Sequence, residues 1–138
     1  MSASVDEIRE FLDKVFPLMR DHMIVEDAQP MRATLRQKID QSSLRPGGTV
    51  SGPTMMGLAD AALYIAIFST IGITPLAVTT SLNFNFLRKP EGNKDITAKC
   101  TLMKVGKALA VGEVTIFSDG DTEPVAHAVG TYSIPPNR

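Results

Sequence analysis

Hydrophobic residues at the start of the chain recur at the spacing of an amphipathic helix. Ser4 and Glu7 stand three positions apart, which is the spacing of a capping box at a helix start. Pro17 disfavours continuation of the helix. We therefore predict a helix over residues 4–16, with its apolar face formed by Val5, Ile8, Phe11, Leu12, Val15 and Phe16.

Residues 21–52 separate the first predicted helix from the next one, and their sequence pattern divides them into three parts. Residues 21–30 contain several charges and a proline, which is typical of a connection. Residues 31–40 alternate in part between apolar and polar positions, which predicts a first strand. Residues 41–52 are rich in serine, glycine and proline, and we interpret them as a loop.

A long apolar helix is predicted after this loop. Pro53 suits the first position of a helix, where its missing N–H would be unpaired in any case, and Gly72 suits the position just beyond the end. The sequence between them is apolar on nearly all sides, which indicates a helix surrounded by protein. Its uncharged run, residues 61–73, has 13 residues, and this length favours a core helix over a membrane span.

After Pro75 the hydrophobic pattern changes to period two, which is the pattern of a strand. One face carries Leu76, Val78, Thr80, Leu82, Phe84 and Phe86, and the other carries Ala77, Thr79, Ser81, Asn83 and Asn85. Further strands are predicted over residues 94–105, 108–118 and 124–134. Four successive strands joined by short turns predict an antiparallel meander that covers the apolar helix, so the predicted class is α+β.

Composition and charge limit the possible functions. The chain has 138 residues, which fits a single domain over residues 1–138. Its net charge of −1 gives no general attraction to nucleic acid or to an anionic membrane. Cys100 is the only cysteine, which excludes an intramolecular disulfide. The first residues are polar and acidic, unlike a secretory signal. We expect a cytoplasmic protein.

Asp60 stands out because of its isolation. It is the only charged residue among the 42 that separate Arg45 from Arg88. A carboxylate within a buried apolar helix is unfavourable unless it is hydrogen-bonded or used chemically. Isolated carboxylates of this kind are frequent catalytic acids and bases. A structural aspartate that bonds a neighbouring backbone group is the alternative, and we favour the catalytic interpretation.

The segment around Asp60 resembles the signature of PaaI-type hotdog thioesterases. In that family a loop ending in His-Gly-Gly opens the central helix, and an Asp or Glu follows nine residues after the His. The interval from Ser51 to Asp60 is also nine residues. Weaker similarities lie at residues 83–90, at residues 105–107 and at residues 128–132. The resemblance covers roughly residues 44–132.

The resemblance implies a hotdog fold over about residues 31–135, in which an antiparallel sheet wraps a long central helix. It also implies a homodimer with shared active sites, and two such dimers could pair into a homotetramer. It implies acyl-CoA hydrolysis with Asp60 as nucleophile or general base, and with the backbone N–H of Gly52 polarising the thioester carbonyl. Helix geometry also indicates that two chains contribute to each active site, because Gly52 and Asp60 are eight residues apart, which is roughly 12 Å along a helix axis. An attacked carbonyl cannot approach both groups within one chain.

Several family positions carry other residues here. Ser51 replaces the family His, Pro53 replaces the second Gly, and Arg45 stands where an Asn is frequent. Ser51 can still donate a hydrogen bond, and the Gly52 N–H remains available, whereas Pro53 has no N–H. The family Ser or Thr of the following strand corresponds to Thr79. Since the alternation places Thr79 opposite the apolar face, Thr80 stays open as a substitute.

Other candidates concern substrate binding. Arg88, Lys89 and Lys107 lie near predicted strand ends, where they either bind CoA phosphates or form a solvated rim. Met56, beside Met55, either lines an adaptable acyl pocket or packs in the core. CoA enters as part of the substrate, and we expect no metal and no other cofactor. His22 is expected at the surface and His127 in a structural position.

Two rival functions stay open beside hydrolysis. A non-catalytic acyl-CoA binding module is favoured by the replacements at Arg45, Ser51 and Pro53. A hotdog dehydratase or hydratase pairs a His with an acidic residue, and no His lies between residues 23 and 126. We therefore place the dehydratase last.

Overall fold

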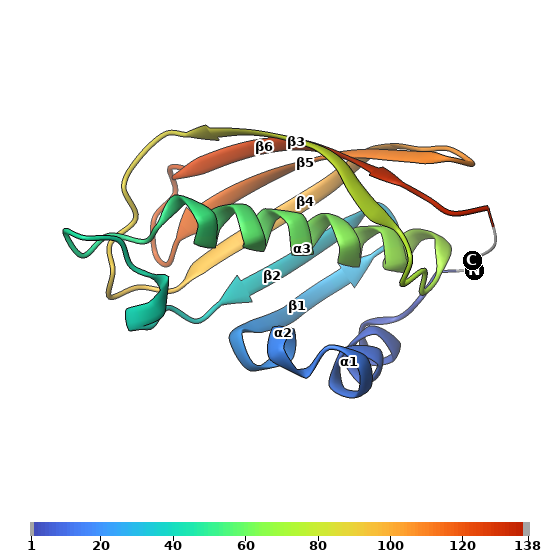
Figure 1. Ribbon diagram of the computed structural model, residues 1–138, viewed down its shortest axis with the longest axis horizontal. Helices are drawn as coiled ribbons and strands as arrows, with labels where there is room; N and C mark the ends of the chain where they lie inside the picture. The colour runs from blue at the N-terminus through green and yellow to red at the C-terminus, as the bar shows by residue number, and fades with distance from the viewer. Residues whose placement is uncertain (1, 137–138) are drawn as a thin grey trace.

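The computed structural model describes residues 2–136 and consists of one sheet wrapped around a long helix (Figure 1). Every neighbouring pair of strands is antiparallel. This is the α+β hotdog arrangement predicted from the sequence, with an additional N-terminal helix. The elements are α1 (Val5–Val15), α2 (Pro17–His22), β1 (Met23–Gln29), β2 (Arg32–Gln37), the short 3-10 helix η1 (Gln41–Ser43), α3 (Gly52–Ile71), β3 (Val78–Phe86), β4 (Ile96–Val105), β5 (Leu109–Ser118) and β6 (Ala126–Ser133).

The strand order of the sheet is β1-β2-β4-β5-β6-β3. The predicted meander of four successive strands is therefore wrong for the first of them, because β3 pairs with β6 and not with β4. The place beside β4 is taken by β2, in a register that matches Arg32 to Thr101. Turn signals in the sequence identify local hairpins, whereas α3 carries the chain across the sheet and so decides where β3 joins it (Figure 1).

The sheet also begins earlier than predicted. Residues 21–30, interpreted as a connection, contain strand β1, and the core starts near Met23 instead of residue 31. A bulge between Val25 and Asp27 explains the error, since it shifts the register against β2. The buried positions Val25 and Ala28 are consequently three residues apart, which hides the period of two.

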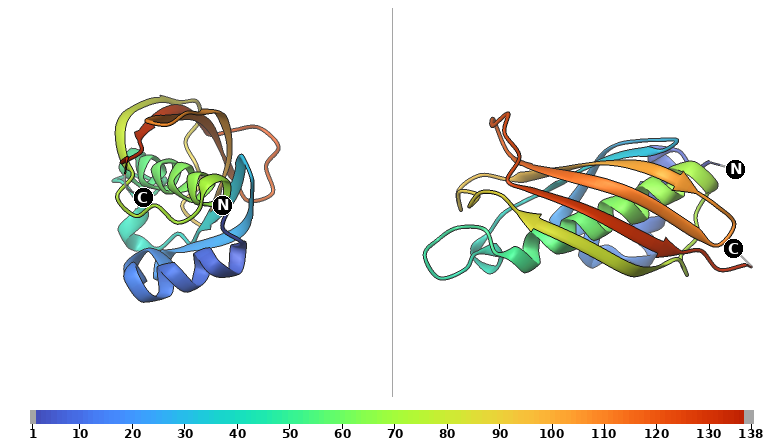
Figure 2. Two further views of the ribbon diagram at one scale, coloured as in Figure 1. Left: turned by 90° about the vertical axis from the view of Figure 1, so that its right-hand side faces the viewer. Right: turned by 90° about the horizontal axis from the view of Figure 1, so that it is seen from above.

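Helix α3 forms the core of the molecule. Figure 2 shows the sheet curving around it, and its buried residues include Leu58, Leu63, Ile65 and Phe68. Leu63 packs so closely on β5 and β6 that a Cβ at Gly112 would lie 2.8 Å from one of its methyl groups, and a Cβ at Gly130 would overlap the other. Among the described residues α3 alone is long and apolar enough to cross a membrane, but here it is a core helix under the sheet.

The N-terminal helix α1 is present and its predicted capping box between Ser4 and Glu7 is formed. The helix ends before Pro17 as predicted, but the chain then forms a second short helix, α2, which the sequence analysis missed. Pro17 occupies the start of α2, a position that proline tolerates well. Helix α1 packs against β1 and α3, and α2 packs against β1 (Figure 1).

Candidate active site

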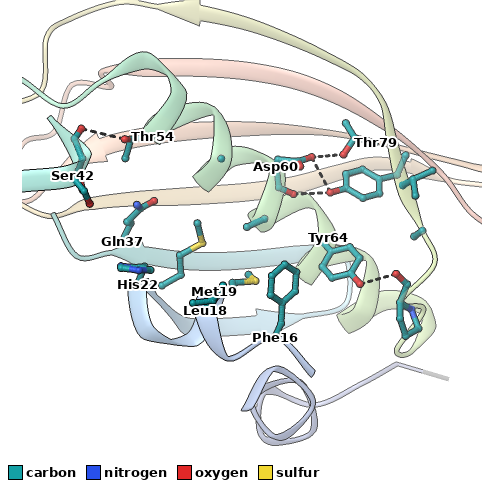
Figure 3. A pocket seen from close by; sticks show the side chains of 18 residues that line it. Phe16, Leu18, Met19, His22, Gln37, Ser42, Thr54, Asp60, Tyr64 and Thr79 are labelled. Atoms are coloured by element: carbon teal, nitrogen blue, oxygen red, sulfur yellow. Dashed lines mark hydrogen bonds between the residues drawn. The ribbon is translucent and has the colours of Figure 1, made fainter. Parts of the chain in front are cut away.

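Asp60 projects from the middle of α3 and its carboxylate is held on one oxygen. The hydroxyl of Thr79 donates to Asp60 Oδ1 at 2.5 Å, and the Tyr132 hydroxyl approaches the same atom at 2.9 Å (Figure 3). Tyr132 also lies 3.0 Å from the backbone oxygen of Asp60. Oδ2 makes no hydrogen bond within residues 2–136. The carboxylate is thus oriented by β3 and β6 while one oxygen stays available.

Tyr132 is a site residue that the sequence analysis did not assign. It ends the apolar alternation of β6 and is 4% exposed. Burial, together with the negative charge of Asp60, raises the pKa of the Tyr132 hydroxyl. The phenol therefore stays protonated at neutral pH and acts as a donor to the carboxylate. A tyrosine at the polar end of a buried strand was the available signal, since its hydroxyl needs a partner.

A bulge in β3 decides which threonine faces Asp60. The register against β6 matches Thr79 to Tyr132 and Ser81 to Thr131, so that Thr80 is the extra residue. Thr79 consequently shares the inner side of the strand with Leu82, and the strict alternation predicted for β3 is wrong at this point. Thr80 instead donates to the backbone oxygen of Thr131 at 3.2 Å. The structure thus brings Thr79, not Thr80, to the carboxylate.

The start of α3 leaves one backbone donor without a partner. Ser51 is the N-cap and accepts from the Thr54 N–H at 3.3 Å, while the two side-chain hydroxyls lie 2.7 Å apart. The Met55 N–H bonds the Ser51 carbonyl, and Pro53 has no N–H. Within the described chain, the Gly52 N–H makes no hydrogen bond. It points from the positive end of the helix dipole, a suitable place for an oxyanion.

Position 52 also has little space for a side chain. A Cβ there would lie 3.2 Å from the ring of Phe86, the last residue of β3. Helix α3 begins at Gly52, one residue before the predicted Pro53, a difference within the usual uncertainty of helix ends. The two ends of β3 therefore mark the two parts of the candidate site, with Thr79 beside Asp60 and Phe86 beside Gly52.

A cavity of about 730 Å³ opens in front of Asp60, between α3 and α2 (Figure 3). Asp60, Thr79 and Tyr132 line it, together with Phe16, Leu18, Met19, His22, Met23, Gln37, Ser42, Ser43, Thr54, Gly57, Ala61, Tyr64, Pro75, Ala77 and Val78. Of the predicted site residues, only Asp60 and Thr79 are among them. Ser51 and Gly52 lie outside, although Thr54 of the same helical turn lines the cavity, so one chain does not bring its own Gly52 N–H to its own carboxylate.

The residues predicted to bind substrate are spread along the molecule and none of them lines this cavity. Arg45 lies in the loop before α3, and Met56 is 40% exposed on that helix. Arg88 pairs with Glu123 at 3.0 Å, and the neighbouring Lys89 is exposed.

Lys107 lies at the other end of the sheet from Arg88. It stands next to the start of β5, where Leu109 matches Ser133, whereas Arg88 follows Phe86, which matches Ala126 at the start of β6. Arg88 and Lys107 of one chain therefore cannot contact one compact phosphate group together.

Comparison with known proteins gives a consistent result. Residues 47–125 match the family model of the thioesterase superfamily. A candidate thioesterase from a Silicibacter species is 40% identical over 96% of this chain and 92% of its own, with a TM-score of 0.88. No curated protein matches the chain.

Two more distant structures share the fold. The PaaI protein from the phenylacetic acid degradation operon of E. coli is 17% identical, with coverages of 95% and 93% and a TM-score of 0.83. A hypothetical thioesterase from Streptococcus pneumoniae, solved with coenzyme A, is 20% identical, with coverages of 83% and 89% and a TM-score of 0.74.

Proposed function

The chain belongs to the thioesterase superfamily, as its resemblance to PaaI-type proteins predicted, and we propose that it hydrolyses the thioester of an acyl-CoA to a free acid and CoA. The observation that carries the proposal is the carboxylate of Asp60, which Thr79 and Tyr132 hold on one oxygen at the wall of the cavity. A carboxylate fixed in this way presents its other oxygen in a defined direction, as a catalytic base or nucleophile needs.

Two routes use the second oxygen, Oδ2, and both fit this arrangement. As a nucleophile, Oδ2 adds to the thioester carbon, the C–S bond breaks, and water then cleaves the resulting anhydride. As a general base, Oδ2 takes a proton from water while the water oxygen adds to the carbon. In either case the thiolate of CoA leaves and is protonated. The hydroxyls of Thr79 and Tyr132 keep Oδ1 in place throughout.

The oxyanion that forms on the carbonyl oxygen needs a hydrogen-bond donor, and we assign this role to the Gly52 N–H of a second subunit. The strand β3 explains how two chains would meet. It lies at the edge of the sheet with Thr79 near its start and Phe86 at its end. Antiparallel pairing of two β3 edges places the start of one strand beside the end of the other.

Such pairing brings the Gly52 of the partner subunit, which lies on the partner's Phe86, toward Asp60 of the first subunit. The exposed edge supports this dimer, because Val78 is 56% and Phe86 52% exposed in the single chain. Apolar residues on an unpaired edge strand favour association with another strand. We propose a homodimer with two such shared sites, and leave its pairing into tetramers to measurement.

CoA is the carrier that best fits the surroundings. A related fold from Streptococcus pneumoniae was solved with coenzyme A. Across the proposed dimer, Lys107 of one subunit would lie at the same end of the joined sheet as Arg88 and Lys89 of the other, with β6 and β3 between them. This arrangement would create a basic site for CoA phosphates that neither subunit has alone.

One observation favours the rival function, a non-catalytic acyl-CoA binding module. Ser51, in the position of the family His, is already engaged with Thr54 as the cap of α3. CoA release from a panel of acyl-CoAs decides between the two. We expect wild type to release CoA and Asp60→Asn to be slower by at least about a hundredfold. Binding of acyl-CoA without any release by wild type would instead identify a binding module.

A further inference from the structure

We infer that the cavity between α2 and α3 is the acyl site, that it takes neutral and largely apolar acyl groups, and that α2 forms the wall limiting their length. The inference rests on the proposed function, because it locates one half of the proposed substrate. It goes further in naming Leu18 and Met19, which no motif identifies, as residues that determine specificity.

The shape of the cavity supports this assignment. Its volume of about 730 Å³ lies within the roughly 300–1,000 Å³ of small-molecule sites. Asp60 lies on the α3 side, and Figure 3 shows Phe16, Leu18 and Met19 on the opposite side. A group bound to a carbonyl carbon beside Asp60 would therefore extend toward α2.

The charges around the cavity limit what it can hold. No lysine or arginine of the described chain lines it, and Asp60 contributes a negative charge. His22, on α2, is the only histidine in the described part of the chain that lines it. A terminal carboxylate on the acyl group would share the cavity with the like charge of Asp60 and would find no lysine or arginine of residues 2–136 there. The predicted basic residues all lie outside, so phosphate binding and acyl binding are separated in space.

Contacts with the rest of the fold hold α2, the wall of the cavity, in place. Met19 is 8% exposed, and the carbonyl of His22 accepts from the Lys38 N–H at 3.0 Å. Helix α1 anchors the preceding segment, since Phe11 packs edge-on against Phe68 with ring centroids 5.5 Å apart. Rigid walls discriminate between ligands by size, because a longer chain cannot displace them without breaking these contacts.

Two exposed residues of the same segment provide a matched pair of variants. Leu18 is 71% exposed and lines the cavity, whereas Val15 is 61% exposed and does not. A tryptophan at either position adds bulk without removing a buried side chain, so both variants should fold. Only Leu18→Trp adds that bulk at the cavity.

The test uses thioethers of CoA, which cannot be hydrolysed, and measures their Kd by calorimetry with the wild-type protein and the two variants. Ethyl-CoA and octyl-CoA differ in length, while butyl-CoA and 3-carboxypropyl-CoA differ in terminal charge. We expect wild type to prefer octyl-CoA to ethyl-CoA, and butyl-CoA to the carboxylate, each by roughly tenfold or more. Leu18→Trp should reduce the length preference roughly tenfold, and Val15→Trp should leave it unchanged.

The inference fails if Leu18→Trp keeps the wild-type preference for octyl-CoA, if Val15→Trp loses it equally, or if the carboxylate binds as tightly as butyl-CoA. Because the analogues report binding alone, failure of the hydrolase proposal is a separate result. A protein that prefers octyl-CoA through Leu18 but releases no CoA from acyl-CoAs would keep this acyl site and lose the proposed reaction.

Discussion

Tyr132 is joined to Asp60 twice, because its hydroxyl lies 2.9 Å from the carboxylate oxygen Oδ1 and 3.0 Å from the backbone oxygen of the same residue. The second contact uses a helical carbonyl and so fixes the phenol relative to the backbone of α3. The first then fixes the carboxylate relative to the phenol. Tyr132 is thus a positioning residue, and its removal should affect the orientation of Asp60 more than substrate binding.

Replacing Tyr132 by phenylalanine should lower kcat for acyl-CoA hydrolysis by about tenfold or more, with little change in KM, because one of two anchors of the carboxylate is lost. The stability cost should be about 1 kcal/mol. Tyr64→Phe is the control, since Tyr64 lines the same cavity but donates to the Pro75 backbone oxygen at 2.9 Å. Equal losses in both variants would argue against positioning by Tyr132.

The two adjacent threonines of β3 should respond differently to the same substitution. Thr79→Val removes the 2.5 Å hydrogen bond to Asp60, and we expect it to lower kcat by about tenfold. Thr80→Val removes only the bond to the Thr131 backbone oxygen and should leave kcat within about twofold of wild type. Steady-state kinetics of the two variants check this, and a larger loss for Thr80→Val would contradict the bulged register.

The same bulge shows where sequence reasoning reached its limit. Hydrophobic periodicity predicted α1, the apolar sequence between Pro53 and Gly72 predicted α3, and the resemblance around Asp60 implied the hotdog fold. Periodicity failed at Thr79 and at β1, since each bulge adds one residue and reverses the alternation beyond it. Tyr132 and Leu18 line one cavity only because the fold brings parts of β6 and α2 to the same part of α3, which no local pattern encodes.

Two glycines of α3 should give opposite results when replaced by alanine. Gly57→Ala meets nothing within 4 Å and should stabilise the protein by roughly 0.5–1 kcal/mol, because alanine favours a helix interior. Gly52→Ala brings a methyl to 3.2 Å from the Phe86 ring and should displace the helix start. Alanine keeps the backbone N–H, so we expect hydrolysis to fall by about tenfold through displacement of the donor, and not by the roughly hundredfold that its removal would cause.

Thermal unfolding and CoA release, measured on both glycine variants, check this pair. Partial recovery of activity in Gly52→Ala combined with Phe86→Leu would show that the ring contact is the cause. Gly52→Pro removes the N–H itself and should lower hydrolysis by about a hundredfold, whereas full activity of that variant would mean that the Gly52 N–H has no part in the reaction.

Cys100 should make stability fall in alkaline solution. It lies in β4 at 2% exposure, and burial, with a smaller effect of Glu113, raises the pKa of its thiol from 9.0 to about 12. The folded state therefore holds the proton more tightly than the unfolded state does. This contribution is fully present below pH 9 and is lost progressively as the pH rises toward 12.

Urea unfolding at several pH values checks the effect by comparison with Cys100→Ala, which removes the titrating group. The difference in unfolding free energy between wild type and variant should shrink between pH 9 and 12. A difference that is constant across this range would mean that the thiol titrates normally in the folded protein.

The shared site makes a prediction that no single variant can test. If each site takes Asp60 from one subunit and the Gly52 N–H from the other, an Asp60→Asn subunit and a Gly52→Pro subunit, which lacks that N–H, are both defective in their own homodimers. A mixed dimer contains one site with an intact Asp60 and an intact Gly52, and one site that lacks both. Two inactive preparations, mixed under conditions that exchange subunits, should therefore regain activity.

Random exchange of equal amounts makes half of the dimers mixed, and each has one of its two sites intact, so about a quarter of wild-type activity should return. CoA release before and after exchange measures the recovery, and sedimentation verifies that dimers are present. A mixture of Asp60→Asn with wild type is the control, since exchange then creates no new intact site. Exchange without recovery would place both groups of each site in one chain, which the roughly 12 Å between them along α3 opposes.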